Sequence, residues 1–152
     1  MGSQPVTFRT LLWTCLLLLG ATSLAGAHAY LDSSFPAENA TVASELNEVI
    51  LRFTEPVEVP FSTFKVYPLA SDEEDPVRLR AAASALVQQV LNLRNDAAQR
   101  ADEGVTTQAR ISAEINIALK KELPPGRYVV MWRVLSIDTH TTTGFFVFTY
   151  AP

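Results

Sequence analysis

Ala109-Arg-Ile-Ser-Ala-Glu-Ile-Asn-Ile-Ala-Leu119 is the stretch that decides the fold class. Every second residue in it is apolar and most of the residues between are polar, which is the pattern of a β-strand with one buried face. Pro124-Pro125-Gly126 follows shortly afterwards and predicts a turn. The stretch therefore predicts a half-buried strand that leads, through a turn, into the next strand of a sheet.

Further strands are predicted on both sides of this stretch. Apolar or alternating runs bounded by Pro, Gly or polar residues lie at residues 46–53, 61–67, 128–135 and 144–150. The first run is expected to end at Thr54-Glu55-Pro56. Tyr128 and Trp132, at alternating positions of the third run, are expected in the core. Short strands at this spacing predict an all-β sandwich or barrel.

One segment has the period of a helix instead. Between Leu79 and Ala97 the apolar residues recur every three or four positions, which predicts an amphipathic helix. Asp75-Pro76 supplies a capping residue and a first turn, and Gly104 a stop. We therefore predict one helical insertion around residues 76–100, which covers a sheet edge or the end of the barrel or, alternatively, provides a docking surface. The acidic run just before it, residues 72–75, is expected to be a solvated loop.

Residues 1–27 have the parts of a secretory signal peptide. Arg9 is the positive residue, an apolar run follows it, and Ala25-Gly26-Ala27 is a cleavage signature. We expect cleavage before His28, which leaves residues 28–152 as one exported domain. An uncleaved membrane anchor is the alternative, but the apolar run is shorter than the roughly 20 residues that a span requires. The mature form is therefore not expected to span a membrane.

Composition narrows the possible partners. The chain has a net charge of −4, and loss of Arg9 with the leader makes it more negative, which disfavours nucleic acid and anionic membrane surfaces. Cys15, the only cysteine, lies in the leader, so the mature domain is expected to have no disulfide and no thiolate metal ligand. Met131 is the only methionine after residue 27, so soft ligands for Cu(I) are nearly absent.

The two histidines of the chain, His28 and His140, suggest a metal site. After cleavage, His28 would offer its α-amine and its imidazole together as a chelate. Asp138 lies two residues before His140, which in an extended strand places both side chains on one side. Three nitrogens and one carboxylate oxygen suit tetragonal Cu(II), with tetrahedral zinc as the competitor. Ser136 and Thr139 are expected to hydrogen-bond the ligands, and a Ser-His-Asp hydrolase arrangement is disfavoured.

Several separated motifs together resemble the bacterial copper-binding CopC family. They are His28-Ala-Tyr-Leu-Asp-Ser-Ser-Phe-Pro-Ala-Glu-Asn39, Val49-Ile-Leu-Arg-Phe-Thr-Glu-Pro-Val-Glu58, Leu123-Pro-Pro-Gly-Arg-Tyr-Val-Val-Met-Trp-Arg-Val-Leu-Ser-Ile-Asp-Thr-His140 and Gly144-Phe-Phe-Val-Phe-Thr-Tyr150. The resemblance implies a periplasmic Greek-key β-barrel of the cupredoxin-like kind that binds Cu(II) through His28, Asp138 and His140. Glu55 matches a family position near the copper, where it is expected to be a weak axial ligand or a neighbour of the ligands, or otherwise a solvent-exposed carboxylate.

The expected function follows from this resemblance. It is a monomeric periplasmic protein that binds Cu(II) for sequestration, transport or resistance, with no catalytic activity and with an inner-membrane copper transporter as a possible partner. Thr141-Thr142-Thr143 replaces a proline that many members have after the second histidine, and the missing methionine-rich site implies binding of Cu(II) alone. Two alternatives remain open: a copper oxidase with a histidine-brace site, and a metal-free β-sandwich that acts as an interaction module.

Overall fold

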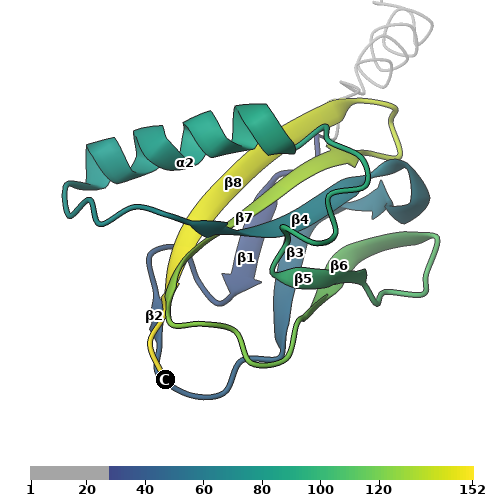
Figure 1. Ribbon diagram of the computed structural model, residues 1–152. Helices are drawn as coiled ribbons and strands as arrows, with labels where there is room; N and C mark the ends of the chain where they lie inside the picture. Colours follow the sequence, from purple (N-terminus) through teal and green to yellow (C-terminus); the bar gives the residue numbers. More distant parts are fainter. Residues whose placement is uncertain (1–27) are drawn as a thin grey trace, which may run out of the picture.

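Residues 28–152 form two four-stranded β-sheets packed face to face, with one α-helix outside them, in the computed structural model of the chain (Figure 1). The sheet orders are β1-β3-β6-β5 and β2-β8-β7-β4, and all neighbours are antiparallel except β2 and β8. The elements are β1 (Leu31–Phe35), β2 (Thr41–Val42), β3 (Glu48–Glu58), the 3-10 turn η1 (Val59–Phe61), β4 (Thr63–Leu69), α2 (Pro76–Val90), β5 (Asp102–Val105), β6 (Ile111–Leu119), β7 (Gly126–Leu135) and β8 (Thr141–Tyr150). The predicted all-β sandwich with one helix is confirmed. The predicted signal peptide lies outside the described residues.

The core between the sheets agrees closely with the hydrophobic pattern. Ile115, Ile117 and Leu119 of β6 are buried, as the alternation requires, whereas Ile111 at the start of the strand is half exposed. Tyr128 and Trp132 of β7 are buried as predicted. The sequence pattern missed β1, β2 and β5, which are short or polar and show no clear period.

β3 continues past Pro56 and is therefore longer than predicted. The pairing of β3 with β6 is irregular between Arg52 and Val57, and Pro56 lies inside this interruption. No regular ladder hydrogen bond requires the missing N–H there, so the strand continues to Glu58. The predicted strand end at Thr54-Glu55-Pro56 was therefore wrong.

Gly144 of β8 lies against the indole ring of Trp132 on the neighbouring strand. A Cβ atom at position 144 would be 2.4 Å from Cζ2 of Trp132, and the indole packs against Phe53 and Phe146 in the core. We expect Gly144→Ala to lower the free energy of unfolding by about 1–3 kcal/mol, because the ring cannot move away without disturbing its neighbours. Urea denaturation measures this change, with the exposed Thr143→Ala as control. Equal midpoints for the two variants would contradict the tight contact.

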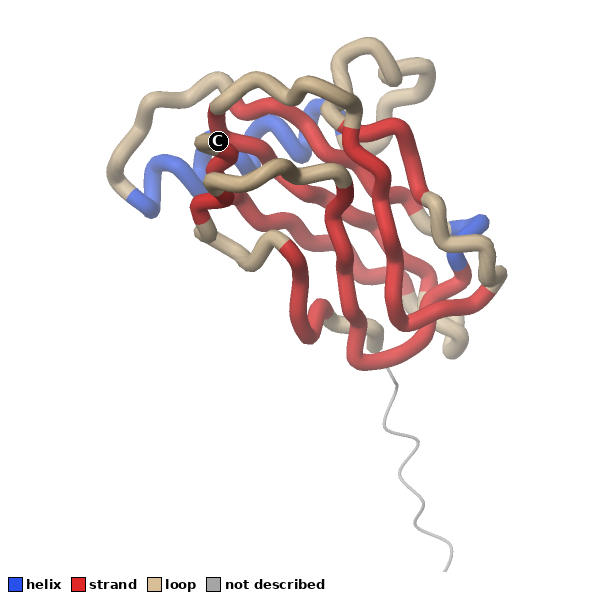
Figure 2. Tube along the Cα trace, turned by 90° about the horizontal axis from the view of Figure 1, so that it is seen from below, coloured by secondary structure: helices blue, strands red, loops and turns tan. Residues whose placement is uncertain are grey.

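Helix α2 lies across the outer face of the sheet β2-β8-β7-β4, as Figures 1 and 2 show from two directions. It begins as predicted: the side chain of Asp75 accepts a hydrogen bond from the backbone N–H of Arg78, and Pro76 is in the first turn. Its apolar side and the outward-facing residues of the sheet form a second hydrophobic cluster, separate from the core between the sheets. The buried residues of this cluster are Tyr67, Leu69, Ala83, Val90, Leu91, Val129, Met131 and Val147.

The helix ends at Val90, so the predicted insertion of helix to about residue 100 was too long. Lys65 of β4 reaches the segment that follows. Its Nζ donates to the carbonyl oxygens of Val90 and Leu93, at 2.8 and 2.9 Å, and lies 2.5 Å from Oδ2 of Asp96. A tertiary contact that the local period does not contain therefore helps to turn the chain out of the helix.

Lys65 and Asp96 form a buried ion pair that Tyr67 completes. The hydroxyl of Tyr67 donates to Oδ2 of Asp96 at 2.6 Å. Burial by itself would raise the pKa of Asp96, but the hydrogen bonds from Lys65 and Tyr67 hold that pKa below its ordinary value. This network fastens the segment after α2 to β4.

The outer edge of β4 is occupied by the residues that lead into β5. The backbone N–H of Ala101 donates to the carbonyl oxygen of Val66 at 2.8 Å, and Oδ2 of Asp102 accepts from the N–H of Val66 at 2.7 Å. Asp102 is buried and is also paired with Arg100. These contacts join the edge strands of the two sheets and close one side of the sandwich.

Candidate metal centre

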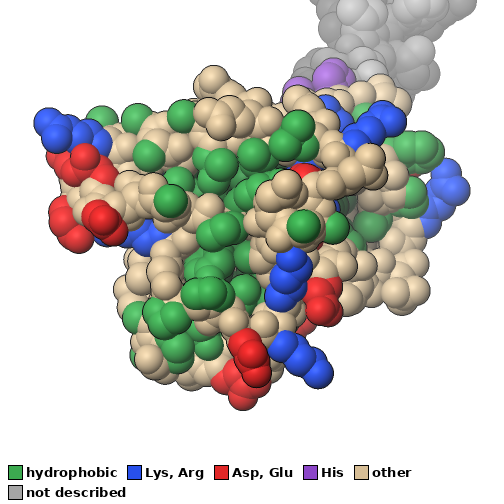
Figure 3. All heavy atoms as spheres, in the orientation of Figure 1, with side chains coloured by type: hydrophobic (Ala, Val, Ile, Leu, Met, Phe, Trp, Pro, Cys, Tyr) green, Lys and Arg blue, Asp and Glu red, His purple; other side chains and the backbone are tan. Residues whose placement is uncertain are grey.

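The two histidines, far apart in the sequence, lie together at one end of the sandwich. The ring centroids of His28 and His140 are 4.6 Å apart, and the ring of Tyr30 stacks 6.1 Å from that of His28. Figure 3 shows histidine side chains at the surface of the molecule. The structure thus brings both predicted histidine ligands to one exposed place.

Asp138 and His140 lie in the tight turn that joins β7 to β8. The turn is closed by backbone hydrogen bonds of 2.9 Å from Ser136 N to His140 O and from Thr139 N to Ser136 O. Oδ1 of Asp138 accepts from the backbone N–H of His140 at 3.1 Å, and its Oδ2 lies 3.0 Å from Nδ1 of the same residue. The predicted proximity of these side chains therefore comes from a tight turn and not from alternate positions of an extended strand.

Thr139 shows how strongly this turn is constrained. Its φ is 72°, in the left-handed region that β-branched residues rarely adopt, at a cost of about 1–3 kcal/mol. Such strain persists only where the surrounding contacts fix the backbone, and it is concentrated at functional sites. The strained residue lies directly between the two predicted ligands.

Asp138 is an ionised carboxylate at neutral pH. The backbone N–H of His140 lowers the pKa of Asp138 below its ordinary value, and the side chains of His140 and His28 add to the effect. The turn therefore presents an anionic oxygen next to an imidazole. Oxygen and nitrogen donors of this kind suit Cu(II) or zinc.

Among residues 28–152, no three His, Cys, Asp or Glu side chains have the spacing of a complete metal site. Asp138 is turned towards the ring of His140, and residue 28 is joined to Ala27, so its backbone nitrogen is an amide and not an amine. With His28 at the terminus, the donors would be two imidazoles, one amine and one carboxylate, which fit Cu(II).

Glu55, the fourth predicted site residue, lies on β3 next to Thr54. The hydroxyl of Thr54 is 3.5 Å from the carbonyl oxygen of His28, so Glu55 belongs to the same end of the molecule. Its side chain is partly exposed. The assignment of Glu55 as an axial ligand or a neighbour of the ligands remains a prediction.

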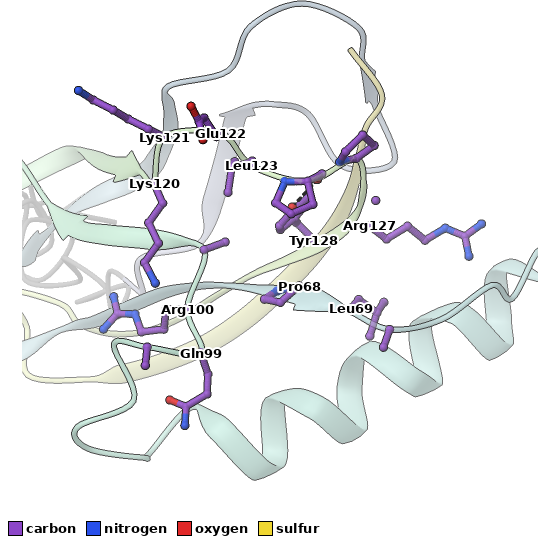
Figure 4. Close-up of a pocket in the computed structure, with 16 residues that line it drawn as sticks. Pro68, Leu69, Gln99, Arg100, Lys120, Lys121, Glu122, Leu123, Arg127 and Tyr128 are labelled. Carbon is purple, nitrogen blue, oxygen red and sulfur yellow. Dashed lines mark hydrogen bonds between the residues drawn. The ribbon is translucent and has the colours of Figure 1, made fainter.

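A cavity of about 500 Å³ lies at the opposite end of the sandwich, where β4 and β6 end and β7 begins (Figure 4). β7 runs from this cavity towards the turn that holds Asp138. Four cationic side chains line the cavity, and three of them already have partners. Arg100 pairs with Asp102, Nζ of Lys120 donates to the carbonyl oxygen of Ala97, and Arg127 donates to the carbonyl oxygens of Ser71 and Glu73. The cavity is therefore separate from the histidines and offers no comparable set of metal donors.

A family model for the CopC domain matches residues 31–151. The chain belongs to the CopC family. The chain is also similar to three curated proteins. Protein YobA of Escherichia coli K12 is 29% identical, and the match covers 80% of this chain and 77% of YobA. Copper resistance protein C of Escherichia coli is 28% identical, and the match covers 88% of this chain and 89% of that protein. Copper transport protein CutJ of Bacillus subtilis is 31% identical over 87% of this chain, but the match spans only 20% of CutJ.

The crystal structure of CopC from Methylosinus trichosporium OB3b has the same fold. It superposes with a TM-score of 0.57 at 26% sequence identity, and the match covers 82% of this chain and 95% of that one. CopC proteins are copper-binding copper-resistance proteins and not enzymes, which confirms the predicted absence of catalysis and removes the oxidase alternative. They are typically periplasmic. Within residues 28–152, no helix is long and apolar enough to cross a membrane.

Proposed function

We propose that this CopC-family chain binds one Cu(II) ion in the periplasm after cleavage before His28. The ligands are the amine and imidazole of His28, the carboxylate of Asp138 and the imidazole of His140, with Glu55 as an axial ligand or a neighbour of the ligands. The protein acts as a monomer that sequesters or carries copper.

The 4.6 Å separation of the His28 and His140 rings is the observation that supports this site most directly. These residues are separated by more than a hundred positions, and among the described residues they are the only histidines. The turn between β7 and β8 adds the ionised Asp138 to the pair. A small rotation of the Asp138 side chain away from His140 would give the metal an oxygen ligand.

The donor set favours Cu(II) over Cu(I). Residues 28–152 contain no cysteine, and Met131 is fully buried under α2, in the hydrophobic cluster on the outer face of the sheet. Cu(I) prefers thiolate and thioether ligands, whereas amine, imidazole and carboxylate donors suit Cu(II). Cu(II) also stands above zinc in divalent affinity.

An inner-membrane copper transporter is the proposed partner. In CutJ, a region similar to nearly all of the domain described here occupies one fifth of a longer copper transport protein. A domain that is joined to a transport protein in one organism is a reasonable donor or acceptor for a separate transporter in another. The exposed position of the histidines suits exchange of the ion with such a partner.

Copper titration of a protein that begins at His28 tests the proposal. We expect one Cu(II) per chain and a tetragonal electron paramagnetic resonance spectrum with coupling to several nitrogens. His140→Ala is expected to remove the coupling of one nitrogen from the spectrum and to weaken Cu(II) binding. Glu114 is an exposed carboxylate of β6, and Glu114→Gln is the control that should leave the spectrum and the affinity unchanged. A His140→Ala protein with the spectrum of the wild type would contradict the site.

A further inference from the structure

The backbone just after His28 is held by side-chain hydroxyl groups. Ala29 is fully buried; its N–H donates to Oγ of Ser136 at 3.1 Å, and its carbonyl oxygen accepts from Oγ1 of Thr142 at 2.7 Å. The N–H of Tyr30 donates to Oγ1 of Thr54 at 3.1 Å. Three hydroxyl groups from three separate segments therefore bind two consecutive residues.

These contacts add to a single backbone hydrogen bond in this segment, from the N–H of Thr54 to the carbonyl oxygen of Tyr30 at 2.8 Å. β1 begins only at Leu31, and its pairing with β3 is irregular between Leu31 and Ser33. The ends of chains usually fray where no ladder holds them. Here Ser136 and Thr142 satisfy both backbone groups of Ala29, so the chain stays in place up to the residue next to His28.

Ser136 also belongs to the turn that carries the other ligands. It is completely buried, its N–H donates to the carbonyl oxygen of His140, and its own carbonyl oxygen accepts from Thr139. Thr142 lies two residues beyond His140 on β8. Through Ser136 and Thr142, the segment that carries His28 and the turn that carries Asp138 and His140 are thus joined directly.

We propose that Ser136 and Thr142 are positioning residues for copper binding. By fixing the backbone of Ala29, they hold the amine and imidazole of His28 close to Asp138 and His140. The ion therefore binds a nearly preformed site. Preorganisation of this kind saves the cost of ordering a flexible terminus on binding. The inference rests on the proposed function, since it assumes that His28 is a terminal ligand.

The test uses Ser136→Ala and Thr142→Val in the protein that begins at His28. Thr142→Ser keeps the hydroxyl group, and Thr143→Val changes the next, exposed residue of β8. We expect each of the first two variants to weaken Cu(II) affinity about 3- to 10-fold, as the loss of one ordinary hydrogen bond implies, and the two controls to match the wild type. The nitrogen couplings in the copper spectrum should become heterogeneous in the same two variants.

Amide hydrogen exchange of the metal-free protein supplies a readout that does not depend on copper. Exchange at Ala29 should accelerate in Ser136→Ala and Thr142→Val, while exchange at the buried Val130 of β7 stays slow because the core is intact. Faster exchange at Ala29 with unchanged copper affinity would overturn the positioning role. If Ser136→Ala does not fold, the comparison of Thr142→Val with Thr142→Ser decides the question. Absence of copper binding by the wild type would instead overturn the proposed function.

Discussion

Keeping Ala27 attached to His28 is expected to weaken Cu(II) binding by about 100-fold or more, a loss of roughly 2.7 kcal/mol. The peptide bond converts the terminal amine to an amide, which is a poor ligand at neutral pH, and the imidazole of His28 loses its chelate partner. Two of the four proposed donor groups are affected by one added residue. No single side-chain change at the site is expected to do more.

Competition with a chelator of known affinity measures this effect on proteins that begin at residue 27 or 28. A protein with one alanine added after Pro152 is the matched control and should bind copper as the shorter chain does. The fold should not change, because the hydrogen bonds of Ala29 and Tyr30 do not involve residue 27. Equal copper affinities for the two N-terminal lengths would show that the amine is not a ligand.

Replacing Lys65 with methionine is expected to lower the free energy of unfolding by about 3–5 kcal/mol, because the buried carboxylate of Asp96 loses its hydrogen-bonded cation and keeps only the more distant Arg100, at 4.0 Å. The Nζ of Lys65 donates to the buried carboxylate of Asp96 and to the carbonyl oxygens of Val90 and Leu93. Urea denaturation followed by circular dichroism measures the change. The double variant Lys65→Met with Asp96→Asn removes the unpaired charge and should recover part of the loss. A single variant as stable as the wild type would show that the pair contributes little.

The same network predicts how stability depends on acid. The pKa of Asp96 is lower in the folded protein than its ordinary value of 3.8, so the folded state favours the ionised form. The stabilisation is therefore complete above pH 3.8 and is lost as the pH falls through the lowered pKa. Asp96→Asn should remove the loss of stability that protonation of Asp96 causes at low pH. Urea unfolding midpoints measured at a series of pH values check this expectation. An unchanged pH profile in Asp96→Asn would contradict the prediction.

Sequence patterns predicted those elements correctly whose structure depends mainly on residues that are close together in the chain. The alternation of residues 109–119 and the capping pair Asp75-Pro76 gave a strand and a helix start that the structure contains. The end of α2 was misplaced because Lys65, distant in sequence, binds the carbonyl oxygens after it. Pro56 misled for a related reason, since only the partner strand shows that the register is interrupted there.

The candidate site also has parts that the sequence predicted and parts that depend on residues far apart in the chain. His28, Asp138 and His140 were identified from residue type and family resemblance, and the structure brings the three together. The turn that joins the last two was not foreseen, because spacing of two residues fits a strand equally well. The binding of Ala29 by Ser136 and Thr142 also had no local signal, since those partners are more than a hundred residues away.

The closure of the β4 edge bears on how the protein behaves when many copies are crowded together. An uncovered edge strand offers unpaired backbone groups to which a strand of another molecule can add, and aggregation often begins in this way. Ala101 and Asp102 already occupy the backbone groups of Val66, so this edge cannot recruit a neighbour there. The insertion that carries α2 thus protects the edge of β4 against strand addition at Val66.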